Sequence, residues 1–496
     1  MIKFKIALVI LFTLVHFGGH SQDIHRLDLE TTIQIAKRQS PTMMTLMRDL
    51  ELAQNNLVAT MAGYKPQVSL NVTLPQYSES IVKYEDSLGI SFYPARQSNM
   101  GSSISVSQRL PTDGSISLSG NLSNTTNFYT SKRSAQFSSR IGISQPIAAF
   151  FGVNNFRMDL KQARLSHDRT MRNLKRRELD LVYNVSQTFY NLLSARENMK
   201  LADNNYARQK EAYEIAKNKY EAGLLREVEA LQMEVDLVTA TNNYENLKTS
   251  YLNMIRDFKE TIGINPMDSI VLLNEMEYKP VRVDVEDAIA RAMAHRNELI
   301  EREIQIEISQ MNLKKIKAAV RISGSIGFGY NFHGAGQSTF DDPYFMAYNN
   351  TWTSLTERPG SFSVGVSGRI PLIDWGANKA RVRSAETGLV QQEVDLETFK
   401  RNLSREIRSL VDKMNNSLRG LEIMEKSVVI AEKSFEISKK RYENDEIDSQ
   451  AMSLERDRLD GAYKSYLSSY ITYKLSLSDL MRTTFFDYEK GVEVLE

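Results

Sequence analysis

The stretch LETFKRNLSREIRSLVDKMNNSLRGLEIMEKSVVIAEKSF (residues 396–435) decides the fold, because its apolar residues recur at a spacing of three and four. The members of this stripe are Leu396, Phe399, Leu403, Ile407, Leu410, Met414, Leu421, Met424, Val428, Ala431 and Phe435. Such a spacing is typical of a coiled-coil seam. No proline interrupts residues 377–459, so the helix can extend beyond the stripe. About 65 helical residues make a rod of roughly 100 Å, which is too long for a compact domain.

The first half of the chain carries a matching long helix. Residues 153–222 contain neither glycine nor proline, and apolar residues again recur at three-and-four spacing. These residues include Val182, Val185, Phe189 and Leu192. Upstream, residues 27–36 and 283–292 both read apolar-Asp-apolar-Glu before a helical pattern. Asp28 and Asp284 are therefore predicted to cap two helices.

Short segments between these helices also repeat. Residues 143–147 correspond to residues 368–372, and each segment is followed by a glycine, Gly152 or Gly376. The offset between the two copies is about 220 to 255 residues throughout. We therefore predict two similar halves, each with a helix, a strand region, a very long helix, a turn and a final helix.

This duplication gives the expected domain boundaries. They are 1–21, signal peptide; 22–65, first helical segment; 66–146, barrel strands and extracellular loops; 147–262, long helical hairpin with a tip near 220–226; 263–283, linker between the repeats; 284–321, second helical segment; 322–372, barrel strands and extracellular loop; 373–484, long helical hairpin with a tip near 442–448; and 485–496, C-terminal tail.

Composition excludes several classes of protein. The 496 residues have a net charge of +1, which argues against a nucleic-acid binder. Cysteine is absent, which excludes disulfide scaffolds and thiolate metal sites. Lys3 and Lys5 precede an apolar run over residues 6–17, and small residues precede Gln22, as in a cleaved export signal. A membrane anchor is the alternative, but the run is shorter than the roughly 20 residues that a span requires.

The segments between the helices alternate with period two. One face is apolar and the other is small and polar, as in residues 68–74, 137–144, 322–332 and 361–370. In an exported chain this pattern predicts a β-barrel with an apolar face toward lipid. The polar stretches 77–101, 123–135 and 333–360 are expected to be extracellular loops.

A closure argument sets the expected assembly. Two strand pairs give at least four membrane strands per chain, and four strands cannot close a barrel without leaving unpaired edges in lipid. The barrel must then be shared between chains, and three chains would supply twelve strands. The fold class is thus mainly α with a β-barrel.

A hairpin signal in the first half has no counterpart in the second. Two alternating runs within residues 103–122 flank Pro111-Thr112-Asp113-Gly114. We expect this hairpin to rise above the barrel as an extracellular extension, because the two halves should contribute alike. The other possibility is that it inserts and enlarges the barrel.

These features together resemble the TolC-like outer-membrane efflux protein family over nearly the whole chain. The marks are residues 144–147 and 370–376, each a strand end, a proline and then a long helix, and the helix-turn-helix tip at residues 220–225. The resemblance implies a homotrimer in outer-membrane lipid with a periplasmic helical tunnel. It also implies docking to a periplasmic adaptor and to an inner-membrane pump, proton-driven or ATP-driven. No enzyme activity, cofactor, metal or nucleic-acid partner is expected.

The resemblance assigns roles to residues at the tips and junctions. The adaptor-docking turn would be Gly223, Leu224 and Leu225, although a plain helix-capping turn would look the same. Candidates for the periplasmic mouth or gate are Tyr220, Glu229, Tyr442, Glu443, Asp445, Glu446 and Asp448; a solvated acidic loop is the alternative. The strand-to-helix junctions are Pro146, Gly152, Pro371, Asp374 and Gly376.

The chain departs from the family pattern at the second tip. Ala451 and Leu454 stand where some members place a ring of aspartates, and Ile447 stands near the position of a gate arginine. A closed state would have to be held differently. A non-conducting structural or adhesive coiled-coil protein remains the alternative function, followed by an exported enzyme, for which we find no nucleophile–base motif.

Overall fold

The computed structural model describes residues 24–86, 89–273, 276–320, 323–444, 446–447 and 449–494. The predicted export signal, residues 1–21, lies outside this part of the chain. The chain forms two compact units. Unit 1 comprises residues up to 49, 172–299 and 398 to the C-terminus, and unit 2 comprises residues 50–171 and 300–397. Among the described residues, no helix combines the length and the apolar character that crossing a bilayer requires.

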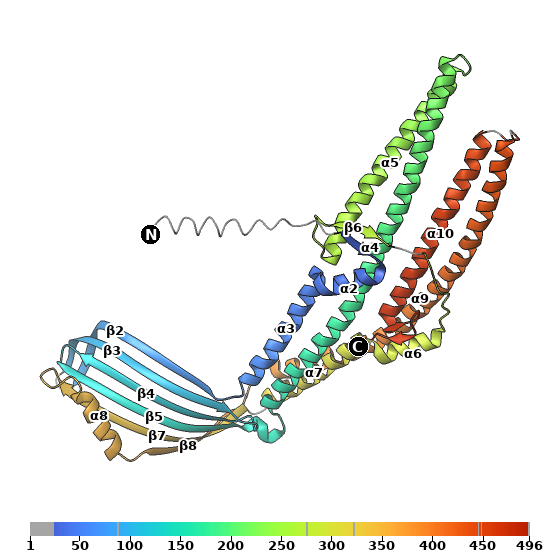
Figure 1. The fold of residues 1–496 in the computed structure, drawn as a ribbon. Coiled ribbons are helices and arrows are strands. Elements are labelled where there is room, and N and C mark those ends of the chain that lie inside the picture. Colours follow the sequence, from blue (N-terminus) through green and yellow to red (C-terminus); the bar gives the residue numbers. More distant parts are fainter. Residues whose placement is uncertain are drawn as a thin grey trace, which may run out of the picture. The chain divides into compact units, whose positions relative to one another are not determined.

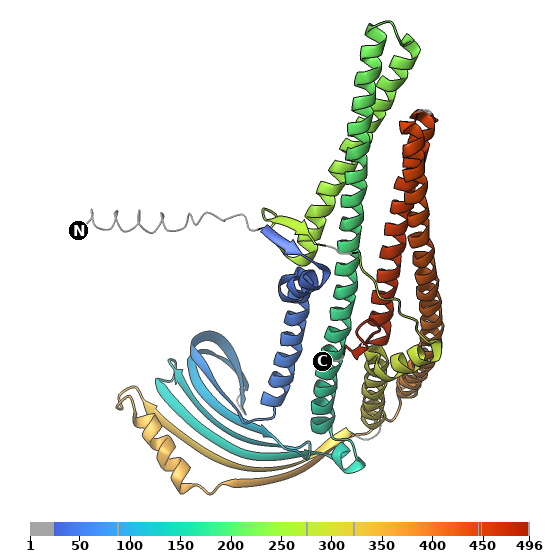
Figure 2. The same ribbon diagram turned by 45° about the vertical axis from the view of Figure 1, so that its right-hand side comes forward.

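Two long helical hairpins dominate unit 1 (Figure 1, Figure 2). Their helices are α4 (Asn155–Glu221) with α5 (Glu227–Ile262), and α9 (Ala377–Glu443) with α10 (Ser449–Thr484). Both α4 and α9 have 67 residues, and the first residues of each belong to unit 2. Both α5 and α10 have 36 residues. The equal lengths confirm the predicted duplication, and a 67-residue helix is about 100 Å long.

Part of the predicted seam is buried, and Phe189 of α4 contacts Phe258 of α5. On α9 the side chains of Leu403, Ile407 and Met414 are fully buried. On α4 the same holds for Val185, while Phe189 is 1% exposed. Burying each such side chain contributes about 1.5–3 kcal/mol, so these positions stabilise the long helices.

The short helices of unit 1 begin as the sequence predicts. Asp28 caps α2 (Leu29–Gln39) by accepting a hydrogen bond from the Thr31 backbone N–H at 2.7 Å. Asp284 caps α6 (Val285–His295) in the same way, with the Asp287 N–H at 3.0 Å. Close to α2, the strands β1 (Ile24–Leu27) and β6 (Ser269–Leu272) pair in parallel. The strands β9 (Phe486–Asp487) and β10 (Val492–Glu493) form a small C-terminal hairpin.

Replacing Asp28 by alanine should loosen α2. Loss of the cap costs about 1 kcal/mol at neutral pH, so hydrogen exchange of the α2 amides should become faster. Asp28→Asn should behave like the wild type, because asparagine caps equally well. The hydrogen bonds from Thr31 lower the pKa of Asp28, so its contribution is complete above the ordinary aspartate pKa and is lost as the pH falls through the lowered value. Equal exchange rates in all three proteins at pH 7 would contradict this role.

Unit 2 contains, within the described residues, a six-stranded antiparallel sheet in the order β2-β3-β4-β5-β7-β8. Its strands are β2 (Gln67–Asp86), β3 (Gly89–Arg109), β4 (Ser115–Asn127), β5 (Lys132–Pro146), β7 (Ser323–Thr339) and β8 (Ser361–Arg369). The other elements that contribute to unit 2 are α3 (Pro41–Ala62), the 3-10 helix η1 (Ile147–Phe151), α7 (Asn297–Ala319) and α8 (Met346–Glu357).

The period-two pattern places apolar side chains on one face of this sheet. The register joins Val68 to Val106, Leu118 to Ile141 and Phe328 to Val364, and paired residues share a face. The exposed apolar residues of this face include Val68, Leu70, Val72, Ile104, Ile116, Leu118, Ile141, Ile143, Phe328, Tyr330, Phe332, Phe362, Val364 and Val366. We call them the apolar band.

The hairpin at residues 103–122 is not an extension above the sheet, so our expectation for it was wrong. Its two runs belong to β3 and β4, which pair with each other. β3 also pairs with β2, and β4 also pairs with β5. The described sheet therefore has six strands in place of the expected four. Its turn lies at the same end of the sheet as the junction after β5. There Thr112 and Gln145 exchange two hydrogen bonds, of 2.8 and 2.9 Å.

The expected extracellular loops are also largely ordered structure. Within residues 77–101, β2 continues to Asp86 and β3 begins at Gly89; within residues 123–135, β4 continues to Asn127 and β5 begins at Lys132. The stretch 333–360 contains the end of β7 and all of α8. Serine, threonine, asparagine and tyrosine on both faces make these segments resemble loops, although cross-strand pairing satisfies their backbone groups.

Candidate functional site

The first helical tip is closed by a Schellman motif. Gly223 has a positive φ of 73° and donates its N–H to the Tyr220 carbonyl at 2.8 Å. The Leu224 N–H reaches the Lys219 carbonyl, also at 2.8 Å. This pair of bonds satisfies the last carbonyls of α4, and glycine fits the left-handed position without a steric penalty. The turn therefore has the helix-capping geometry that the sequence left open as the alternative to a docking role.

Beyond capping, this turn presents an apolar side chain to solvent. Leu224 is 77% exposed, whereas the residue at this position of a Schellman motif often packs back on its helix. Leu225 is half-buried and Tyr220 is 43% exposed. Helix capping does not require the exposure of Leu224, so that exposure is consistent with a docking role.

Glu229 lies on this same tip. Its carboxylate accepts a hydrogen bond from Arg226 Nε at 2.7 Å, one turn earlier at the start of α5. Arg226 occupies the N-cap position without a capping side chain, and Glu227 and Glu229 follow in the first turn. The carboxylates interact favourably with the helix dipole there, so Glu229 has a local role besides the predicted one at the mouth.

The second tip joins α9 to α10 and holds an ion pair that the sequence pattern did not predict. Arg441 Nε lies 3.3 Å from a carboxylate oxygen of Glu446, and both side chains are 54% exposed. The Glu446 N–H also donates to the Arg441 carbonyl at 2.8 Å. Asp445 and Asp448 lie outside the described residues, and Tyr442 and Glu443 are described only as the end of α9.

This ion pair weakens the acidic character expected at the second tip. An exposed pair contributes about 0–1 kcal/mol, so it breaks and forms readily. While it is formed, the guanidinium of Arg441 offsets the charge of Glu446. The sequence signal for this pair is an arginine five residues before a glutamate across a helix end.

The second strand-to-helix junction is ordered by Asp374. Its two carboxylate oxygens accept the N–H groups of Asn378 and Gly376, each at 3.0 Å. These backbone hydrogen bonds lower the pKa of Asp374. Gly376 has a φ of 85°, and the preceding Trp375, at 54°, is also left-handed and 96% exposed. Asp374 therefore fixes the start of α9.

The first junction uses different residues for the same purpose. Gly152, with a φ of 78°, ends η1 after Pro146. Asp113, in the turn of the additional hairpin, accepts the Phe156 N–H at 3.1 Å and a side-chain hydrogen bond from Asn155 at 2.9 Å. The hairpin turn thus caps the start of α4. Sequence reasoning missed Asp113, because its partners lie more than 40 residues away.

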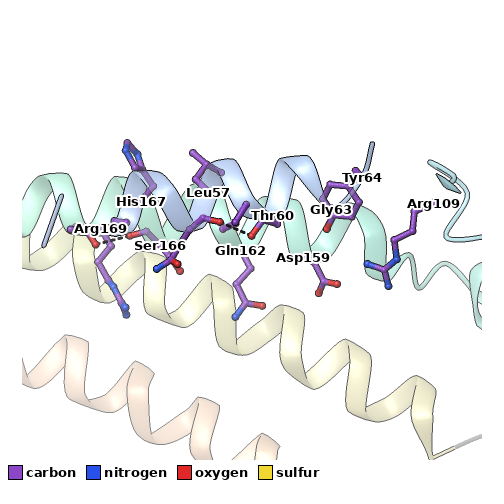
Figure 3. A pocket seen from close by; sticks show the side chains of 15 residues that line it. Leu57, Thr60, Gly63, Tyr64, Arg109, Asp159, Gln162, Ser166, His167 and Arg169 are labelled. Atoms are coloured by element: carbon purple, nitrogen blue, oxygen red, sulfur yellow. Dashed lines mark hydrogen bonds between the residues drawn. The ribbon is translucent and has the colours of Figure 1, made fainter. Parts of the chain in front are cut away.

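Unit 2 also has a pocket of about 680 Å³ between α3 and the first turns of α4, with Arg109 at its rim (Figure 3). Asp159 on its wall pairs with Lys315 at 2.5 Å. His167 lies eight residues along α4 from Asp159, which is a rise of about 12 Å along the helix axis. Figure 3 shows the His167 side chain pointing away from Asp159. The lining residues, all described, do not bring an acid, a base and a nucleophile together. Nor does any group of three His, Asp or Glu side chains in the described part of the chain suit a metal ion.

Comparison with known proteins gives concordant matches. A family model described as outer membrane efflux protein matches residues 32–263 and 343–444. The outer membrane protein TolC of Vibrio cholerae is 21% identical over 325 residues, which cover 63% of this chain and 71% of TolC.

Solved structures resemble the chain over most of its length. The CmeC outer membrane channel of Campylobacter jejuni superposes with a TM-score of 0.68 at 15% identity, covering 94% of this chain and 87% of CmeC. The outer membrane protein VceC of Vibrio cholerae superposes with a TM-score of 0.61 at 14% identity, covering 92% of this chain and 95% of VceC. The open MtrE channel of Neisseria gonorrhoeae superposes with a TM-score of 0.60 at 14% identity, covering 92% of this chain and 88% of MtrE. These structures and the chain share one fold.

Proposed function

The chain belongs to the outer membrane efflux protein family, and from that membership we propose that it is the channel of a tripartite export system. It is an outer-membrane protein that extends into the periplasm. In our proposal a periplasmic adaptor joins it to an inner-membrane pump, either proton-driven or ATP-driven. The pump supplies the energy, and this chain supplies a passive path. The observation that carries the proposal is one chain holding both the apolar band and helices of about 100 Å.

The apolar band supports a barrel shared between copies. Among the described strands, β2 and β8 each lack a neighbour on one side. Unpaired backbone groups in hydrocarbon cost several kcal/mol each, so both edges need partners. The six strands alternate in direction, so β8 of one copy can pair antiparallel with β2 of the next. Three copies would give about eighteen strands in place of the expected twelve, enough to surround an aqueous lumen.

Exposed stripes on the helices support the same homotrimer. Apolar residues at heptad spacing face solvent on two helices of unit 1 and lie between 52% and 76% exposed. They are Val228, Leu231, Val235 and Val238 on α5, and Ile423, Ile430 and Ile437 on α9. A coiled-coil stripe that its own chain leaves uncovered is suited to a helix of another copy.

Export by living cells tests the proposed function. A strain without its own copy of this channel should accumulate a fluorescent efflux substrate, and expression of the chain together with its adaptor and pump should lower that accumulation. The purified protein should also conduct ions across a planar lipid bilayer. Failure of both assays with protein that is present in the outer membrane would support a non-conducting structural role instead.

Exposed Leu224 provides a test of adaptor docking. Leu224→Asp should reduce export and co-purification of the adaptor at least about tenfold, because a buried carboxylate costs well over 1.4 kcal/mol in an apolar contact. Leu224→Met keeps the apolar area and should preserve both. Since this side chain is 77% exposed, neither change should alter the thermal stability of the channel. Normal adaptor binding by Leu224→Asp would rule out the docking role.

A further inference from the structure

The helix α8 packs on the same sheet face as the apolar band. In β7, the glycines that α8 contacts, Gly334 and Gly336, are an even number of residues away from Phe328 and Phe332. The pairing of β7 with β5 continues without a bulge from Gly336 to Phe328. Figure 1 and Figure 2 both place α8 along β7. Residues at even positions of an unbroken strand lie on one face. The side of the sheet that would face lipid in the proposed barrel therefore carries a helix.

Close packing holds α8 in this position. A Cβ atom on Gly334 would lie 2.5 Å from the Thr351 carbonyl oxygen, and one on Gly336 would lie 2.3 Å from that of Ala347. The Thr351 hydroxyl lies 2.9 Å from the Ala135 carbonyl oxygen and 2.7 Å from that of Ala347, and Asn350 donates to the Gln337 carbonyl at 2.8 Å. Small residues and hydrogen bonds to the strand backbone thus make α8 a fixed part of the sheet.

The outward side of α8 presents one exposed tryptophan among mainly uncharged polar residues. Trp352 is 65% exposed, and Phe345 and Tyr344, just before the helix, are 68% and 53% exposed. The helix sequence MAYNNTWTSLTE has Glu357 as its only charged residue. Exposed tryptophan and tyrosine beside uncharged polar residues are typical of the boundary between lipid headgroups and acyl chains.

The position of α8 along β7 matches such a boundary. An outer-membrane barrel has an apolar band about 25 Å tall and strands tilted about 40°, so about ten residues cross it at 3.3 Å each. Counted from Ser323, the first residue of β7, ten residues end at Phe332. Gly334 and Gly336, which lie under α8, follow immediately.

We propose that α8 is an interfacial helix that binds the headgroup–acyl boundary of the outer leaflet, with Trp352 as its anchor. The proposal rests on the proposed barrel, in which the apolar band faces lipid. Continuity with that band argues for a lipid rather than a protein partner. Asn124 of β4 also donates a hydrogen bond to the Tyr348 hydroxyl of α8 at 3.0 Å, so the helix reaches from β7 across β5 to β4. The helix would fix the depth of the sheet in the membrane.

Tryptophan quenching in vesicles tests this proposal. The chain has two tryptophans, so Trp375→Phe leaves Trp352 as the single reporter. The full chain is placed in phosphatidylcholine vesicles that contain lipid with a nitroxide at carbon 5 or at carbon 12 of the acyl chain. The shallow nitroxide should quench Trp352 more than the deep one. Two further single-tryptophan chains serve as references, Phe328→Trp within the apolar band and Leu224→Trp at the helical tip, each in a background with both native tryptophans replaced by phenylalanine.

The outcomes separate the two proposals. Quenching of Phe328→Trp by the deep nitroxide together with shallow quenching of Trp352 supports the interfacial helix. If Phe328→Trp is quenched but Trp352 responds only to aqueous iodide, α8 lies in water and the inference is wrong. If Trp352 is protected from both, a protein covers α8 and the inference is equally wrong. If Phe328→Trp behaves like the tip reference, the sheet is not in lipid and the proposed barrel itself fails.

Discussion

Joining the two helical tips covalently should abolish export. With cysteines in place of Leu225 and Ile447, a bismaleimide that links the two positions should reduce export to the level of cells without the channel. The chain has no native cysteine, so the reagent reacts only with the introduced cysteines. The expected effect is a complete loss of transport, because in our account the tips must separate to open the periplasmic mouth.

The physical reason is that opening requires the two tips to move apart. The ion pair between Arg441 and Glu446 lies within the second tip, so it does not tie that tip to the first. A covalent link between Leu225→Cys and Ile447→Cys prevents the movement. A series of linkers of increasing length selects one that matches the distance between the tips.

Two controls make this experiment decisive. Each single-cysteine chain treated with the same reagent sets the export that modification alone leaves, and export by the linked pair should fall well below that level. A linker with an internal disulfide should block export until it is reduced. Unchanged export by a fully cross-linked population would refute a gate at the tips, while leaving the channel itself intact.

Gly263→Ala should cause a large loss of stability. Gly263 ends α5 with a φ of 79°, and a Cβ atom there would lie 2.3 Å from the Gln39 carbonyl oxygen. The left-handed conformation alone costs alanine about 1–2 kcal/mol. Relief of the clash would have to shift the backbone at the end of α2, so we expect a total above about 3 kcal/mol and little mature protein in the membrane.

Gly223→Ala is the matched control. This glycine has nearly the same φ of 73°, but no atom lies within 4 Å of the position of a Cβ. Only the conformational cost of about 1–2 kcal/mol then applies, and it falls on an exposed turn. Thermal melting monitored by circular dichroism should rank the proteins as wild type, Gly223→Ala and then Gly263→Ala. Equal melting of the two variants would show that the contact with Gln39 does not matter.

The helical part of the fold could be predicted from sequence because its energetics are local and periodic. The three-and-four spacing around Leu403 and Ile407 identified the seam, and Asp28 and Asp284 identified two helix starts. Each signal lies within a few turns of the element that it specifies. The equal lengths of the matched helices follow from the same repeated pattern.

The sheet was harder to predict, because its partners are distant in sequence. The strands on either side of Pro111 read correctly as a hairpin, but only the pairing with β2 and β5 shows that it belongs to the sheet. The capping role of Asp113 and the packing of α8 on Gly334 and Gly336 likewise depend on tertiary neighbours. In α8, the residues Tyr348, Thr351, Trp352 and Thr353 also have strand propensity, so local preference did not indicate a helix.

The roles of the tip residues remain proposals. The structure gives Gly223 and Leu224 the geometry expected of a capped and exposed turn. It also adds Arg441 as the partner of Glu446. Docking depends on a second protein, whose surface no pattern within this chain specifies.

The mass of the complex extracted from outer membranes tests the central claim most directly. The account predicts a species of about three chains by native mass spectrometry in detergent, found in the outer-membrane fraction and absent from the inner-membrane fraction. Three copies would pair both open edges of every six-stranded sheet and cover the exposed helical stripes. A single-chain mass in that fraction, or a soluble periplasmic species, would contradict the shared barrel and with it the conduit.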